Sequence, residues 1–226
     1  KLQASLKMAI ANLLLENFSA TYLNINQTIE YINKGGINMI NDKRNRKNSM
    51  VFFNLLSTLY PKLKKKSRHL IKKKIPHIGE SHCLSFAHLP IQISSEIKKI
   101  QPILIIGAKA WHFANNKSNQ WKTSLLSQIK NHNYSEEVFI SFGEIDCRED
   151  EGILYYSKKN HKQLSTVSKK TINGYLDFME NSLSEFYSKR FYFGVPAMMK
   201  NKITTSLDLE RKELIRNYNY LLKEEV

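Results

Sequence analysis

The chain has 226 residues and is strongly basic, with 35 Lys and Arg residues against 20 Asp and Glu residues and a formal net charge of +15 at pH 7. This length suits one large domain, or one domain with a small helical appendage, and a hydrophobic content of 42% supports a packed core. No apolar run approaches the roughly 18 residues that a membrane-spanning helix needs, so no membrane span is predicted. Only two cysteines are present, which argues against a disulfide scaffold and favours reduced thiols in a cytoplasmic protein.

Residues 1–60 are predicted to be all-helical, because apolar residues recur there at helical spacing. The first two series are Leu6, Ile10, Leu13, Leu14 and Phe18, followed by Tyr22, Ile25, Ile29 and Ile32. Gly35 and Gly36 interrupt the pattern, and 37–59 is a third helix-compatible stretch. Paired helices of this length resemble a tetratricopeptide repeat with its turn at 17–19, which would imply a longer array that binds a protein partner. A simple helical cap explains the same pattern.

A run of Lys and Arg residues at 61–74 connects this helical segment to the rest of the chain. Such a cluster can bind nucleic acid or another acidic surface. No Phe, Tyr or Trp is interleaved with the lysines, as a surface that stacks on bases would require. We therefore interpret 61–74 as a solvated basic connector, and nucleic acid is not an expected partner.

From residue 75 onward, strand-like and helix-like segments alternate. Strands are predicted at 75–79, 103–107, 138–143 and 191–196, and helices at 93–100, 121–129, 167–186 and 207–222. Thr205 and Asp208 have the spacing of a capping box at the start of the last helix. Alternation with these connection lengths predicts an α/β fold, namely a three-layer α/β/α parallel sheet of the flavodoxin-like type.

Three of the predicted strands end in a glycine, which an acid follows at Gly79 and Gly143, and these strand ends carry the candidate chemistry. Reacting groups in open α/β sheets lie just beyond the carboxyl ends of the strands, where glycine permits a sharp turn. The first strand ends in Gly79-Glu80-Ser81, so Ser81 is the candidate nucleophile. Cys83 is a weaker candidate, because nothing nearby in the sequence lowers the pKa of its thiol.

These blocks resemble the SGNH hydrolases, also called GDSL-type esterases, over roughly residues 75–226. Gly79-Glu80-Ser81 matches the family's Gly-Asp-Ser with Glu in place of Asp, Gly107 takes the place of the second-block glycine, and 143–146 matches the third block. The resemblance implies that Ser81 forms an acyl-serine intermediate. It also implies that the backbone N–H groups of Ser81 and Gly107 form the oxyanion hole.

Two departures from the family pattern bear on activity. The oxyanion Asn of the third block falls on Ile145, which cannot donate a hydrogen bond from its side chain. The late Asp-x-x-His that supplies the family's base is absent from the sequence. Our interpretation is a hydrolase-like domain at 75–226 that is truncated at its C-terminus, with the base beyond Val226.

Further side chains are expected to bind substrate or line the site; they are His82, Lys109, His112, Glu144, Asp146 and Arg148. His82 directly follows Ser81, so its ring is expected to point away from the serine and to pack or orient substrate. Asp146 is expected to pair with Arg148 or with loop amides, because a carboxylate aimed into the oxyanion hole would oppose catalysis. No metal and no cofactor are predicted, since the acidic turn at 146–151 lacks the glycine-turned spacing of a calcium loop.

The leading functional hypothesis is a serine esterase or deacylase that acts on a small ester or on an O-acylated glycan. Trp111 and Trp121 could stack on a sugar ring, although core packing would explain them equally well. The alternative is a catalytically inactive SGNH-like binding module coupled to helical repeats, which the apolar Ile145 favours.

Overall fold

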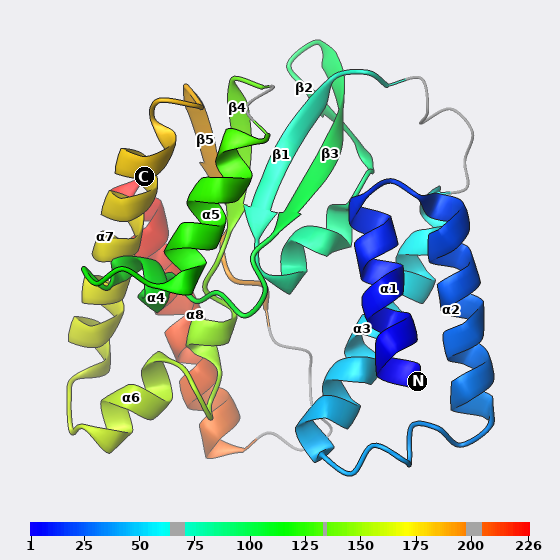
Figure 1. Ribbon diagram of the computed structural model, residues 1–226. Helices are drawn as coiled ribbons and strands as arrows, with labels where there is room; N and C mark the ends of the chain where they lie inside the picture. The colour runs from blue at the N-terminus through cyan, green and yellow to red at the C-terminus, as the bar shows by residue number, and fades with distance from the viewer. Residues whose placement is uncertain (64–70, 133–134, 198–204) are drawn as a thin grey trace. The chain divides into compact units, whose positions relative to one another are not determined.

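The computed structural model describes residues 1–63, 71–132, 135–197 and 205–226, which form two compact units (Figure 1). The first unit comprises Lys1–Lys74 and Leu84–Pro102, and the second comprises Ile75–Cys83 and Ile103–Val226. In the described part of the chain, no helix combines the length and the apolar character needed to cross a membrane.

The first unit begins with the helices α1 (Leu2–Leu14), α2 (Phe18–Asn33) and α3 (Lys43–Leu63). α1 and α2 pack against each other (Figure 1), and Asn17 caps α2 by accepting the N–H of Ala20. The helical segment predicted from the apolar spacing is therefore present. α3 continues into the predicted basic connector, whose central part, 64–70, lies outside the described residues.

Glu16, in the turn between α1 and α2, anchors these helices to the strands of the same unit. Its carboxylate accepts from Lys74 at 2.6 Å and also pairs with Lys99. Burial alone would raise the pKa of Glu16, but the two lysine hydrogen bonds lower it to about 2. Lys73 pairs with Glu96 in the same region. At the described end of the connector, Lys73 is thus both paired and exposed to solvent.

The segment 93–100, predicted to be helical, is instead part of an antiparallel hairpin. β2 (Pro90–Ile93) pairs with β3 (Glu96–Leu104), with Ile93 opposite Glu96. The spacing of the isoleucines fits a helix, but Ser94 adopts a left-handed φ of 55° and closes a two-residue turn. β3 ends at Leu104, so the strand predicted at 103–107 begins and ends earlier than expected, and 106–107 is a turn.

The sheet has the strand order β2-β3-β1-β4-β5, with β1 (Lys74–Gly79), β4 (Glu137–Ser141) and β5 (Lys189–Tyr192) parallel to one another. β1 and β3 are also parallel. The N–H of Lys99 bonds to the carbonyl oxygen of Lys73, and six residues later in both segments the N–H of Ile105 bonds to the carbonyl oxygen of Gly79, so the two segments run in the same direction. The prediction of an α/β fold with a mostly parallel sheet is confirmed. β2 is the antiparallel edge that the sequence analysis did not anticipate.

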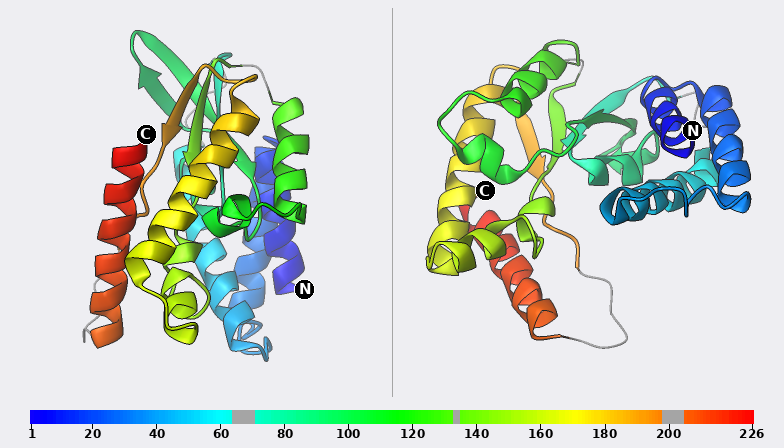
Figure 2. Two further views of the ribbon diagram at one scale, coloured as in Figure 1. Left: turned by 90° about the vertical axis from the view of Figure 1, so that its left-hand side faces the viewer. Right: turned by 60° about the horizontal axis from the view of Figure 1, so that its bottom comes forward.

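The helices of the second unit are α4 (Ala110–Ala114), α5 (Gln120–Lys130), α6 (Ile153–Lys159), α7 (Leu164–Leu183) and α8 (Ser206–Glu225). α7 packs against both α4 and α8 (Figure 2). The capping box predicted at the start of α8 is confirmed, because Asp208 accepts the N–H of Thr205 and donates its own to the threonine hydroxyl. α4 and α6 are short helices that were not predicted.

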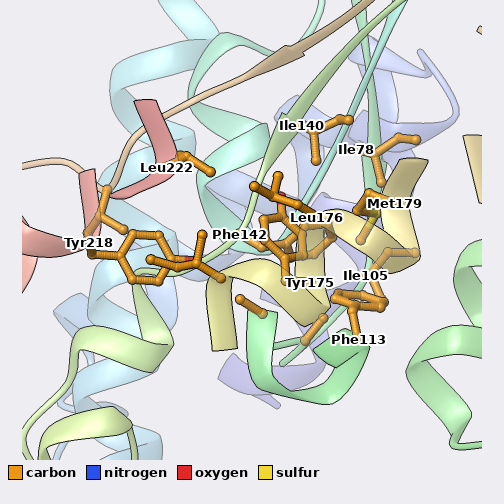
Figure 3. Close-up of a cluster of buried hydrophobic side chains, with 14 of the residues drawn as sticks. Ile78, Ile105, Phe113, Ile140, Phe142, Tyr175, Leu176, Met179, Tyr218 and Leu222 are labelled. Atoms are coloured by element: carbon orange, nitrogen blue, oxygen red, sulfur yellow. The ribbon is translucent and has the colours of Figure 1, made fainter. Parts of the chain in front are cut away.

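The core of the second unit lies between the sheet and these helices (Figure 3). Ile78 of β1 and Ile140 of β4 occupy paired positions and contribute to one buried cluster with Tyr175 and Met179 of α7. Gly174 brings α7 close to α4, since a Cβ there would lie 3.0 Å from the carbonyl oxygen of Ala114. This packing holds α4, and the loop that precedes it, in place beside the carboxyl end of the sheet.

His88 gives a testable pH dependence for the first unit. Its buried Nε2 lies 2.8 Å from the carbonyl oxygen of Leu13, and burial lowers its pKa to about 4, below the unfolded value near 6.5. The neutral ring therefore stabilises this unit above pH 6.5, and the contribution is lost as the pH falls toward 4. His88→Gln keeps a donor for Leu13 but cannot titrate, so the hydrogen-exchange protection factors of α1 and α2 should fall less on acidification than in the wild type.

The backbone at His88 is left-handed, with φ of 57°, so the His88→Gln variant is expected to be less stable than the wild type at every pH. The comparison therefore concerns how steeply protection changes with pH and not its absolute level. His77 and His112, whose pKa values are also lowered to about 4, belong to the second unit, which is why exchange must be read on α1 and α2. Equal slopes in variant and wild type would contradict the role of His88.

Candidate active site

The candidate site is built on the carboxyl ends of β1 and β4, which are neighbouring parallel strands. Gly79 pairs with Ser141 at the end of the ladder, and the N–H of Glu80 continues to the carbonyl oxygen of Ser141 at 3.3 Å. A Cβ at Gly79 would lie 2.2 Å from Ser141 Oγ and 2.7 Å from its carbonyl oxygen. A glycine is required here because the two strands approach so closely, and the loops beginning at Glu80 and Gly143 therefore leave the sheet side by side.

Glu80 is the buried centre of the first loop, with a side chain only 2% exposed. Its Oε2 accepts the hydroxyl of Ser81 at 2.9 Å, and its Oε1 lies 2.6 Å from Nδ1 of His82. The hydrogen bond with Glu80 raises the pKa of His82, although burial opposes the shift. One carboxylate thus orients both the candidate nucleophile and the neighbouring histidine, and the His82 ring is directed to Glu80.

Glu144 is the centre of the second loop and is held by two guanidinium groups. Arg148 donates to Oε2 through Nε at 2.9 Å and Nη2 at 2.8 Å, and Arg211 donates to Oε1 at 3.0 Å. Arg148 also reaches Glu151 at 3.2 Å. Arg148 therefore pairs with Glu144 and Glu151, and not with Asp146. Arg211 was not a candidate from the sequence, because it lies 67 residues from Glu144 and no local pattern marks it.

Glu80, His82 and Glu144 bring possible ligand atoms within 4.8 Å of one another, a donor set of two carboxylates and one imidazole. Such a set could hold a divalent cation such as zinc. Both oxygens of Glu144 already accept from arginine, however, and Nδ1 of His82 already lies 2.6 Å from Oε1 of Glu80. We interpret these residues as an ion-pair network.

Asp146 fixes the loop that follows β3. Its side chain is 1% exposed and accepts the N–H of Ala110 at 2.7 Å and that of Trp111 at 3.0 Å. Burial raises the pKa of Asp146 to about 6, although these two hydrogen bonds oppose the shift. Of the two partners considered for Asp146, the loop amides are the ones it binds. Gly107, with a left-handed φ of 67°, lies in the turn just before this clamp.

Lys109 and His112 belong to the same loop and the start of α4. Nδ1 of His112 accepts the N–H of Lys109 at 3.0 Å, and the ring stacks on Trp121 with 3.5 Å between centroids. Burial and the nearby Lys109 lower the pKa of His112 to about 4, so the ring is neutral near pH 7. Lys109 Nζ donates to the carbonyl oxygen of Glu151 at 2.8 Å. Trp121 is therefore a packing residue beneath His112.

The predicted site residues fall into two connected groups. Ser81, His82 and Glu144 gather around Glu80, whereas Lys109, His112 and Asp146 line a cavity with Glu151. Arg148 connects the groups through Glu144 and Glu151. Ile145, between Glu144 and Asp146, is buried at 7% exposure.

The burial of both cysteines disfavours them as nucleophiles. Cys83 and Cys147 are both buried and free, and burial raises the pKa of each thiol, which keeps them protonated.

Asp146→Ala should destabilise the second unit by about 1–3 kcal/mol, because the buried N–H groups that begin α4 lose their acceptor. Asp146→Asn retains one acceptor oxygen and should lose less. Urea unfolding at pH 7 of the wild type and both variants measures the difference. Equal stability of the Ala and Asn variants would show that the two hydrogen bonds do not carry the stabilisation.

No family model, curated protein or solved structure matches the chain significantly.

Proposed function

We propose that the second unit is an SGNH-like serine hydrolase, with the three-layer flavodoxin-like arrangement of that family, that cleaves an ester through Ser81. The observation that supports this proposal is the hydrogen bond of 2.9 Å from the Ser81 hydroxyl to the buried carboxylate of Glu80, at the carboxyl end of β1. A serine is a poor nucleophile unless a base lies within hydrogen-bond reach of its hydroxyl. Glu80 meets that requirement geometrically.

The reaction balances with residues of this chain. Ser81 Oγ attacks the ester carbonyl while its proton passes to Glu80 Oε2, and the negative charge develops on the carbonyl oxygen. The backbone N–H groups of Ser81 and Gly107 are the proposed donors to that oxyanion. The C–O bond to the alcohol then breaks, and the leaving alkoxide takes the proton from Glu80. Water, activated by the same carboxylate, releases the acid and restores Ser81.

His82 and Glu80 share one hydrogen bond, with 2.6 Å between Nδ1 and Oε1. While His82 is an imidazolium, its positive charge attracts the Glu80 carboxylate and competes with the proton that Ser81 would transfer. When His82 loses its proton at higher pH, this positive charge beside Glu80 disappears. We therefore expect the rate of acyl transfer to rise with pH through the raised pKa of His82.

Ser81→Ala should abolish hydrolysis of p-nitrophenyl acetate, because the attacking oxygen is gone. Glu80→Gln keeps the shape of the carboxylate but cannot accept the proton, so kcat should fall by about 10²–10⁴-fold. Ser85→Ala, a half-buried serine in the same short helix η2 (Ser81–Phe86), is the matched control and should retain activity. Initial rates from pH 5 to 9 measure all three. Undiminished turnover in Ser81→Ala would exclude the serine mechanism.

A second function is a non-catalytic SGNH-like binding module, and the buried apolar Ile145 favours it. A serine-directed fluorophosphonate separates the two functions, since it labels only an activated serine. Mass spectrometry should find the label on Ser81 of the wild type and not on Ser85. No labelling at Ser81 would favour the binding module.

A further inference from the structure

The second unit contains a cavity of about 200 Å³ beside the charge network. It is formed by the loop after β3 with α4, by the turn after β4 with the start of α6, and by Val167 of α7, so it lies along the same carboxyl edge of the sheet as Ser81. The side chains that shape it are Lys109, Trp111, His112, Glu151, Tyr155 and Tyr156. Its volume is below the roughly 300–1,000 Å³ of pockets for drug-sized ligands, so it suits a single small ring.

Three large aromatic side chains are exposed around this cavity. Trp111 is 47% exposed, Tyr155 is 46% exposed and Tyr156 is 41% exposed. Exposed rings gathered around one hollow are typical of a binding site, whereas isolated exposed rings need no explanation. Trp121 provides the contrast, because it packs against the core and stacks on His112. Lys159 Nζ lies over the Tyr155 ring at 5.7 Å from its centroid, and Lys162 Nζ lies over the Tyr156 ring at 5.6 Å. The cavity therefore offers a ligand the Trp111 ring and the tyrosine ring surfaces that these lysines leave open.

The charged groups of the cavity are already paired with each other. Lys109 Nζ lies 3.4 Å from the carboxylate of Glu151, and that carboxylate also accepts from Arg148. Asp146 is engaged by the amides of Ala110 and Trp111. His112 presents a neutral ring near pH 7. An anionic or cationic ligand would have to compete with these pairs, so a neutral polar ligand fits best.

We propose that this cavity is a subsite for one neutral sugar ring, the carbohydrate part of an O-acylated substrate. A pyranose has C–H groups that pack against aromatic faces and hydroxyl groups that bond to polar edges, which is the combination that Trp111, Tyr155 and Tyr156 present. Lys109 and Glu151 can form hydrogen bonds with the sugar hydroxyl groups while the ion pair between them remains intact. The inference rests on the proposed function, because it supplies the alcohol part of the ester that Ser81 would cleave.

The connection to Ser81 runs through contacting side chains. Glu151 is joined to Arg148, Arg148 to Glu144, and the carboxylate of Glu144 lies within 4.8 Å of the Glu80 and His82 ligand atoms. A sugar bound in the cavity would contact Glu151, which begins this series of side chains. The acyl group of such a substrate would have to extend along the sheet edge, past Arg148 and Glu144, to reach Ser81.

The test is direct binding of methyl glycosides of glucose and N-acetylglucosamine, measured by saturation-transfer NMR and titration. We expect binding by the wild type and equally by Ser81→Ala, and a loss of affinity of about tenfold or more in Trp111→Ala and Tyr155→Ala. Tyr220→Ala is the control, because Tyr220 is 60% exposed on α8 and does not line the cavity. Binding of neither glycoside, or equal affinity in the Trp111, Tyr155 and Tyr220 variants, would overturn the subsite. Displacement of the sugar by octanoate would instead assign the cavity to an acyl chain.

A kinetic comparison separates this proposal from the proposed function. In Trp111→Ala, KM should rise for a mono-O-acetyl methyl glucoside and remain unchanged for p-nitrophenyl acetate, which has no sugar to bind. Sugar binding without any hydrolysis by the wild type would remove the esterase and leave the subsite. Hydrolysis of both esters with unchanged KM in the variant would remove the subsite and leave the esterase.

Discussion

The close approach of β1 and β4 at Gly79 and Ser141 is the constraint on which the candidate site depends. A Cβ at Gly79 would lie 2.7 Å from the carbonyl oxygen of Ser141, a backbone atom that cannot rotate away, so no other residue fits there without a shift of the strands. Because the strands are parallel and in this register, the loops that follow them begin at neighbouring points of one edge. Glu80 and Glu144, far apart in the sequence, thereby come close enough for their carboxylates to belong to one network.

Two acids brought this close would repel each other unless cations lie between or beside them. His82 faces Glu80, while Arg148 and Arg211 face Glu144. Partly buried ion pairs add little net stability, since desolvation offsets much of their attraction, but they favour one arrangement of the side chains. That arrangement aims the Ser81 hydroxyl at Glu80 and positions Arg148 to reach Glu151.

Asp146 binds backbone N–H groups, and its burial explains why. A carboxylate with 1% exposure needs hydrogen-bond donors, and the free N–H groups at the start of α4 provide them. The result is that the Gly107 turn, Lys109 and Trp111 are held against the loop after β4. The cavity exists because this clamp brings that loop beside Glu151 and the tyrosines of α6.

The sequence by itself determined the α/β class, the helices α5, α7 and α8, the capping box at Thr205 and the strand-end positions of Ser81 and Glu144, because these depend on local periodicity and turn residues. It did not determine the β2–β3 hairpin, since the isoleucine spacing fits helix and strand alike and only the Ser94 turn decides. Tertiary structure alone decided that Arg211 faces Glu144, that Asp146 caps α4 and that Trp111 is exposed while Trp121 is packed. Each of these contacts joins residues that are far apart in the sequence and that the folded sheet brings together. The spacing of residues along the chain does not reveal which distant segments will meet.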